Sequence, residues 1–171
     1  MSAEGVVMQS LAEAVTESQS RVLHEAMLDL MLEAEAAAVI LCDSGGNILT
    51  NTSWQDQEHV DSVAALAAGS FAATQALASL TGEARFNSVA HEGTSSSVYI
   101  QRIAHEFLLV VQFGKSTSLG LVKLYVEKTE HTIAGLLSIV MENGGMACQD
   151  AEVFEMEPIE SVFNLPSSAQ A

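Results

Sequence analysis

Basic residues are scarce in this sequence of 171 residues, which has 6 Lys and Arg against 22 Asp and Glu. The net charge of −16 at pH 7 repels nucleic-acid phosphates and anionic lipid surfaces, because both attract clustered cations. We therefore expect no nucleic-acid partner. Proline and aromatic residues are also few (2 Pro, 5% aromatic), yet 49% of the residues are hydrophobic, and this composition excludes a wholly disordered chain.

Cysteine is rare as well. Cys42 and Cys148 lie far apart and belong to no C-x-x-C or Cys/His spacing, so we expect no disulfide framework and a reducing, cytoplasmic location. The first cation is Arg21, so no basic region marks a secretory signal. Segment 62–82 carries no charge and could span a bilayer by length, but it is rich in Ala, Ser and Thr and lacks basic flanks. We expect no membrane insertion.

The hydrophobic pattern predicts one α+β domain. Apolar residues at three- and four-residue spacings predict a helix over 6–35. The Ala-rich segment 61–80 is too long for a strand and predicts a second helix, which Gly82 ends, and the segment 119–141 after a polar loop predicts a third. Short apolar runs between turn residues predict five strands, at 38–42, 48–49, 87–91, 98–102 and 107–113. The expected fold is a five-stranded antiparallel sheet flanked by helices, in the order helix, two strands, helix, three strands, helix.

Motifs of catalytic and metal sites are incomplete throughout the sequence. Segment 114–117 reads Gly-Lys-Ser-Thr, like the end of a phosphate-binding loop, but Leu109 stands where that motif needs its first glycine. We interpret Ser116, Thr117 or Ser118 as the cap of the last helix. No H-E-x-x-H or G-x-S-x-G occurs, and Cys42 lies in an apolar run. We expect no catalytic centre, no metal and no cofactor.

The Ala-rich helix is the most informative segment. Ala64, Ala68, Ala72 and Ala76 form an i, i+4 row on a helix that is uncharged on its other faces too. One explanation is that the helix lies deep in the core of a single chain, since Ala is a good helix former. A single sheet with three helices hardly covers one helix on all sides, so we favour a protein–protein surface.

The sequence resembles the Roadblock family and, within it, the bacterial MglB-like proteins, from about Val22 to Met141. Four segments carry the resemblance: VILCDSGGNIL, SVAALAAGSFAATQALASLTGE, HEGTSSSVYI and LLVVQFGKSTSLGLVKL. The acidic end EMEPIESVFNLPSS looks like the C-terminal segment of the same proteins. On this basis we divide the chain into an N-terminal helix extension (1–21), a Roadblock domain (22–145) and an acidic tail with a short partner-binding helix (146–171).

The resemblance implies a Roadblock-like homodimer whose central helices pair and whose sheets join edge to edge. It also implies a partner, a small Ras-like GTPase of the MglA type, whose GTP hydrolysis the dimer accelerates in bacterial cell polarity or motility, with enrichment at a cell pole. The partner-facing positions that it implies are three alanines and four tail residues: Ala68, Ala72, Ala76, Pro158, Ile159, Val162 and Phe163.

Two mechanisms and one alternative role follow from this resemblance. The chain has three Arg, at 21, 85 and 102, and Arg85 is the one nearest a loop suited to insertion into a GTPase site. We favour an indirect mechanism, in which the dimer positions the catalytic residues of the GTPase itself. The alternative is a Roadblock adaptor that binds a GTPase or scaffold without stimulating hydrolysis.

Overall fold

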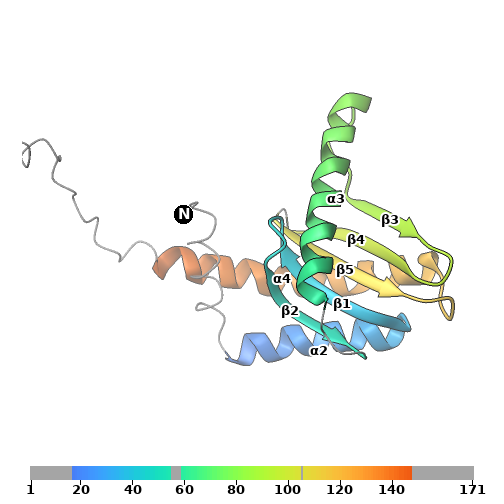
Figure 1. Ribbon diagram of the computed structural model, residues 1–171. Coiled ribbons are helices and arrows are strands. Elements are labelled where there is room, and N and C mark those ends of the chain that lie inside the picture. Colours follow the sequence, from blue (N-terminus) through green and yellow to red (C-terminus); the bar gives the residue numbers. More distant parts are fainter. Residues whose placement is uncertain (1–16, 55–58, 105, 148–171) are drawn as a thin grey trace, which may run out of the picture.

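The structure, a computed structural model, describes residues 17–54, 59–104 and 106–147. The elements follow the expected order of helix, two strands, helix, three strands and helix (Figure 1). Their bounds are α2 Glu17–Glu33, β1 Ala36–Asp43, β2 Ile48–Ser53, α3 Val60–Thr81, β3 Ser88–Glu92, β4 Ser97–Ile103, β5 Phe107–Phe113 and α4 Leu119–Ala147. The predicted fold class is therefore confirmed.

The strands form one antiparallel sheet in the order β2-β1-β5-β4-β3. β1 and β5 lie at its centre and are buried along almost their whole length, which explains why both read as continuous apolar runs. β2 and β3 form the two edges.

The helices cover both faces of the sheet, α2 and α4 on one and α3 on the other (Figure 1). Because neighbouring residues of a strand point to opposite faces, Leu109 and Val111 pack with α2 and α4. Leu108 and Val110 belong to the second cluster, with the alanines of α3. The sheet thus has a large core under two helices and a smaller one under α3.

The β1–β2 turn brings the sheet into contact with α3. The Asp43 carboxylate accepts hydrogen bonds from the backbone N–H groups of Gly45 (2.9 Å) and Asn47 (2.7 Å) and from the Asn47 side chain (2.8 Å). Gly46 has φ +87°, and a Cβ there would lie 2.7 Å from the Cα of Ala65. Glycine is required at this point by both its backbone angle and the closeness of the helix.

Several predicted helix ends differ from the structure. α3 begins at Val60, one residue before the predicted start, and His59 precedes it without a side-chain cap; Gly82 ends it at φ 77°, as predicted. Ser118 caps α4, because its Oγ accepts the backbone N–H of Leu121 at 3.3 Å. The predicted end of the last helix at residue 141 is wrong, because α4 extends to Ala147. A glycine costs a helix only about 1 kcal/mol and does not by itself end it. The predicted helical residues 6–16 lie outside the described part of the chain.

Candidate functional site: the exposed face of the central helix

α3 packs on the sheet through its small side chains. The residues that it buries are Ala64, Ala67, Ala68, Phe71 and Ala78. Alanine on this face lets the helix axis lie close to the strands, over Ile40, Ile100 and Val110. The first half of α3 therefore belongs to the core of the chain itself.

The opposite face of α3 is apolar and open. Leu66, Leu77 and Leu80 are 74%, 53% and 84% exposed, which is unusual for large hydrophobic side chains. Asp61, in the first turn, is the one charged residue of the helix. By length and composition alone α3 could cross a membrane, but the packing of its alanines on the sheet makes it an element of the layered domain.

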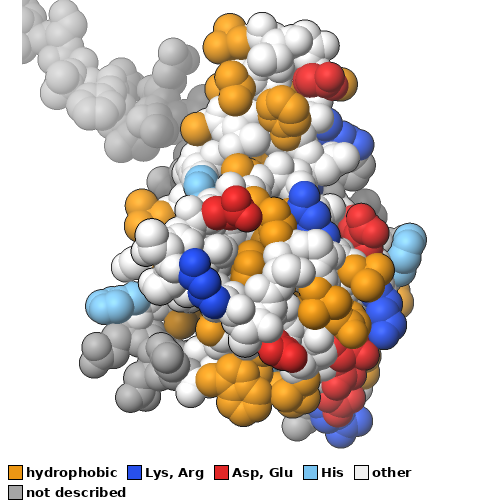
Figure 2. Space-filling model, turned by 90° about the vertical axis from the view of Figure 1, so that its right-hand side faces the viewer, with side chains coloured by type: hydrophobic (Ala, Val, Ile, Leu, Met, Phe, Trp, Pro, Cys, Tyr) orange, Lys and Arg blue, Asp and Glu red, His pale blue; other side chains and the backbone are white. Residues whose placement is uncertain are grey.

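The second half of α3 projects past β3, the edge strand (Figure 1). Two hydrogen bonds hold this part of the molecule together: the Gln75 side chain donates to the backbone oxygen of Phe86 at 2.8 Å, and Ser70 Oγ lies 2.8 Å from His91 Nε2. Figure 2 shows hydrophobic side chains gathered on the projecting end, at the top of that view. An exposed apolar helix face beside an open sheet edge is typical of a protein–protein surface.

The structure separates the alanines that the sequence placed in one row. Ala68 is only 4% exposed and packs against the sheet, so its assignment to a partner-facing surface is corrected: it is a core residue. Ala72 and Ala76 are exposed. The row divides because four residues turn a helix by about 400°, and each step along it shifts the side chain by about 40°.

The four tail residues predicted to face a partner, Pro158, Ile159, Val162 and Phe163, lie outside the described residues. The exposed leucines of α3 were missed by the sequence reading. Their spacing could have revealed them, because Leu66, Leu77 and Leu80 fall on the side of the helix opposite Ala64 and Phe71.

Reactive groups do not gather in the described part of the chain. Its His, Cys, Asp and Glu residues form no group of three or more that could hold a metal ion. Burial, assisted by the neighbouring Asp43 carboxylate, raises the pKa of the Cys42 thiol to about 12. The thiol therefore stays protonated at neutral pH and is a poor nucleophile.

The three arginines lie in different parts of the molecule. Arg102 lies over the ring of Phe71, 5.1 Å from its centroid, at the border between β4 and α3. Arg21 lies 3.9 Å from Glu25, one turn further along α2. Arg85 is exposed in the loop between α3 and β3.

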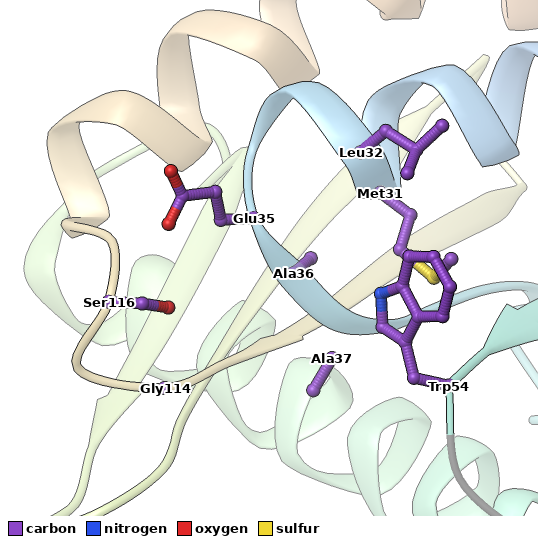
Figure 3. A pocket seen from close by; sticks show the side chains of 8 residues that line it. All are labelled: Met31, Leu32, Glu35, Ala36, Ala37, Trp54, Gly114 and Ser116. Carbon is purple, nitrogen blue, oxygen red and sulfur yellow. The ribbon is translucent and has the colours of Figure 1, made fainter.

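A second open feature is a cleft of about 480 Å³ at the other end of the molecule, where α2 meets β1 (Figure 3). Trp54, which is 65% exposed, lies along one wall near Met31 and Leu32. Glu35 and Ser116 lie at the other end of the cleft. The sequence analysis did not predict this cleft.

The fold agrees with comparisons to known proteins. The model of the Roadblock/LC7 domain matches residues 23–113, from α2 to the end of β5. The chain belongs to the Roadblock/LC7 family. Its resemblance to MglB-like Roadblock proteins, expected from the sequence, is confirmed by solved structures, whereas no curated protein matches.

Three of these Roadblock structures are MglB proteins. The gliding protein MglB from Thermus thermophilus is 31% identical, with a TM-score of 0.68, over 72% of this chain and 94% of that one. MglB from Myxococcus xanthus is 30% identical, with a TM-score of 0.68, over 74% and 95%. An MglB in a tetrameric arrangement is 29% identical, with a TM-score of 0.69, over 74% and 95%.

Proposed function

We propose that this protein is a homodimeric regulator of a small Ras-like GTPase of the MglA type and accelerates GTP hydrolysis by that partner. The observation that carries the proposal is the open, uncharged face of α3 on a Roadblock fold similar to MglB over nearly the whole length of those chains. Such a face works by contact with other proteins, and the described residues form no metal site that would suggest chemistry of their own.

A second copy of the chain would cover the leucines of α3. Leu66, Leu77 and Leu80 would then leave water together, which supplies the main driving force for association. β3 has an open outer edge and lies beside the projecting half of α3, so the two sheets could join there.

The GTPase would contact the dimer through the flank of α3 that carries Ala72 and Ala76, both exposed and small. Fast hydrolysis by a Ras-like GTPase needs an ordered water and a cation near the developing charge. With Arg102 placed over Phe71 and Arg21 in α2, this chain offers few cations for that role. We infer that the dimer acts by ordering the catalytic residues of the GTPase.

Single-turnover hydrolysis tests the proposal. An MglA-type GTPase loaded with GTP is mixed with the full chain, phosphate release is followed, and complex formation is measured in parallel. We expect a complex and an increase in rate of tenfold or more. A complex without acceleration would select the adaptor role, and no complex with any MglA-type GTPase would overturn the proposal.

The proposed cellular role is in polarity or motility, in the cytoplasm and with enrichment at one cell pole. A fluorescent fusion of the full chain tests it. A uniform distribution, in cells where the fusion is intact, would contradict this role but not the biochemical one.

A further inference from the structure

The cleft where α2 meets β1 combines an apolar surface with one carboxylate. Its apolar part is formed by Met31, Leu32, Ala36, Ala37 and Trp54. Among the described residues that line the cleft, Glu35 is the one with a charged side chain, and it lies at the end away from Trp54 (Figure 3). A ligand that fills this space is therefore apolar along most of its length and cationic at one end.

The Trp54 end of the cleft is open to a partner. Trp54 is 65% exposed and Leu32 is 51% exposed, so two large apolar side chains border the cleft without being covered. The nitrogen of the indole ring lies on the side that faces Ala36 and Ala37 (Figure 3). The indole N–H is a hydrogen-bond donor with no acceptor capacity. This wall thus offers an apolar surface and one donor, which suit an apolar side chain and a backbone carbonyl of a peptide.

Glu35 occupies an unfavourable backbone conformation. Its φ is +50°, in the left-handed region that follows the end of α2 at Glu33. Glycine most often stands at this position after a helix, because a residue with a Cβ adopts the left-handed conformation only at a cost in conformational energy. The chain therefore places a carboxylate at this end of the cleft where a glycine would fit the backbone better.

We propose that the cleft binds an arginine or lysine side chain of another protein, together with an apolar residue next to it in that protein. The Glu35 carboxylate pairs with the cation, and the methylene stem lies over Ala36 and Ala37. The apolar neighbour packs on Trp54, whose N–H donates to a backbone carbonyl of the bound segment. The cleft is built from α2, β1 and the ends of their neighbours, so this site does not depend on the GTPase contact proposed for α3.

Charge favours a basic segment of a different protein over the ends of this chain. Segments 1–16 and 148–171 contain acidic residues and no Lys or Arg, so the Glu35 carboxylate would repel them. It would repel an anionic small molecule for the same reason. The net charge of −16 also attracts a basic partner from a distance and so raises the rate of encounter.

Trp54 fluorescence reports binding at the cleft directly, because Trp54 is the single tryptophan of the chain. The full chain is titrated with the blocked tripeptide acetyl-Leu-Arg-Leu-amide and with a matched peptide that has citrulline, which is uncharged and similar in shape, in place of arginine. We expect a saturable change in emission with the arginine peptide and roughly fivefold weaker binding of the citrulline peptide, as for a partly exposed ion pair. Equal binding of the two peptides, or no saturable change with either, would overturn the proposal.

A pair of variants separates Glu35 from the charge of the whole protein. Glu35→Gln keeps the size of the side chain and should bind the two peptides alike, with roughly fivefold lower affinity than the parent chain has for the arginine peptide. Glu25→Gln removes the same charge from a side chain of α2 that is 65% exposed, and it should bind like the parent chain. Equal losses of affinity in the two variants would show that net charge alone attracts the peptide and would overturn the site.

Glu35→Gly tests the backbone argument independently. Glycine adopts φ +50° readily, so the variant should unfold at a higher urea concentration than the parent chain and yet lose its preference for the arginine peptide. A lower urea midpoint would overturn the backbone argument, and a retained preference would overturn the role of the carboxylate. Trp54 emission that acrylamide fails to quench in the parent chain would show that the protein itself covers the cleft, which would overturn the proposal but not the proposed function.

Discussion

Gly46 is the residue at which the β1–β2 turn rests on α3. Its φ is +87°, and a Cβ at this position would lie only 2.7 Å from the Cα of Ala65, so there is no room for a side chain. We expect Gly46→Ala to lower the free energy of unfolding by about 2–4 kcal/mol, from backbone strain and a clash with helix backbone. Urea unfolding followed by circular dichroism measures this change.

The neighbouring glycine is the matched control. A Cβ on Gly45 would lie 3.3 Å from the side chains of Asp43 and Asn47, which can shift. Gly45→Ala should therefore cost less than about 1 kcal/mol, as most exposed substitutions do. Equal losses of unfolding free energy in the two variants would show that the contact between the turn and α3 does not contribute to stability.

Cys42 is a buried thiol whose pKa lies well above its ordinary value. Burial and the Asp43 carboxylate raise this pKa from 9.0 to about 12. With Cys148→Ser, we expect the folded protein to react with a thiol reagent at pH 8 on the order of a thousandfold more slowly than the urea-unfolded chain, because so little thiolate is present. Rapid reaction of the folded protein would contradict the buried position.

The same shift predicts a pH dependence of stability. The folded pKa is higher than the unfolded one, so the unfolded chain loses its proton first as pH rises. The contribution of Cys42 to the free energy of unfolding is complete below pH 9 and is lost as the pH rises toward about 12. Urea midpoints should fall less steeply over this range in Cys42→Ala than in the parent chain.

At the scale of the element, the sequence predicted α3 well but not which of its faces is open. The absence of charge and the closing Gly82 predicted a helix over 61–80, and the structure has it over Val60–Thr81. The alanine row suggested a single face, whereas the helical twist places Ala68 in the core and leaves Ala76 exposed. Composition alone does not show which side of the helix faces the sheet. That orientation decides which alanines a partner can contact.

For the strands, too, local sequence predicts some features and misses others. Residues 107–113 were predicted as observed, because a fully buried strand has a continuous apolar run. β2 was predicted as two residues but extends to Ser53, since Thr50, Asn51 and Thr52 look polar in isolation. Pairing with β1 supplies hydrogen bonds that local sequence does not reveal.

The flank of α3 that carries Ala72 and Ala76 can be tested with charge. We expect Ala72→Arg combined with Ala76→Arg to abolish binding of the GTPase and to leave a dimer, because a contact surface cannot desolvate two unpaired guanidinium groups. Pull-down with the GTP-loaded GTPase and sedimentation of the variant measure both. Thr132→Arg with Ser138→Arg adds the same charge on exposed residues of α4 and should bind normally. A monomeric double variant would mean that this flank lies inside the dimer.

At the scale of the whole molecule, the shortage of cations bears on how the protein would accelerate GTP hydrolysis. A net charge of −16 with 6 basic residues leaves little to stabilise the charge on a transferring phosphoryl group. Lys128 lies 3.2 Å from Glu33, and Lys123 lies over the Tyr99 ring, 5.6 Å from its centroid. Both lysines are on α4, on the opposite side of the sheet from α3. Acceleration by this chain would therefore come from positioning the residues of its partner.

Arg85 is the residue that decides between positioning and an arginine finger. It is exposed in the loop after α3, four residues past Thr81, the last residue of that helix. An arginine finger contributes about 10³- to 10⁵-fold to hydrolysis, whereas a contact residue contributes far less. We expect Arg85→Ala to lower the single-turnover rate with the GTPase by less than tenfold. A loss of about a thousandfold with binding intact would assign Arg85 as the finger, and Arg85→Lys would then fail to restore the rate, because an ammonium lacks the planar fork of the guanidinium.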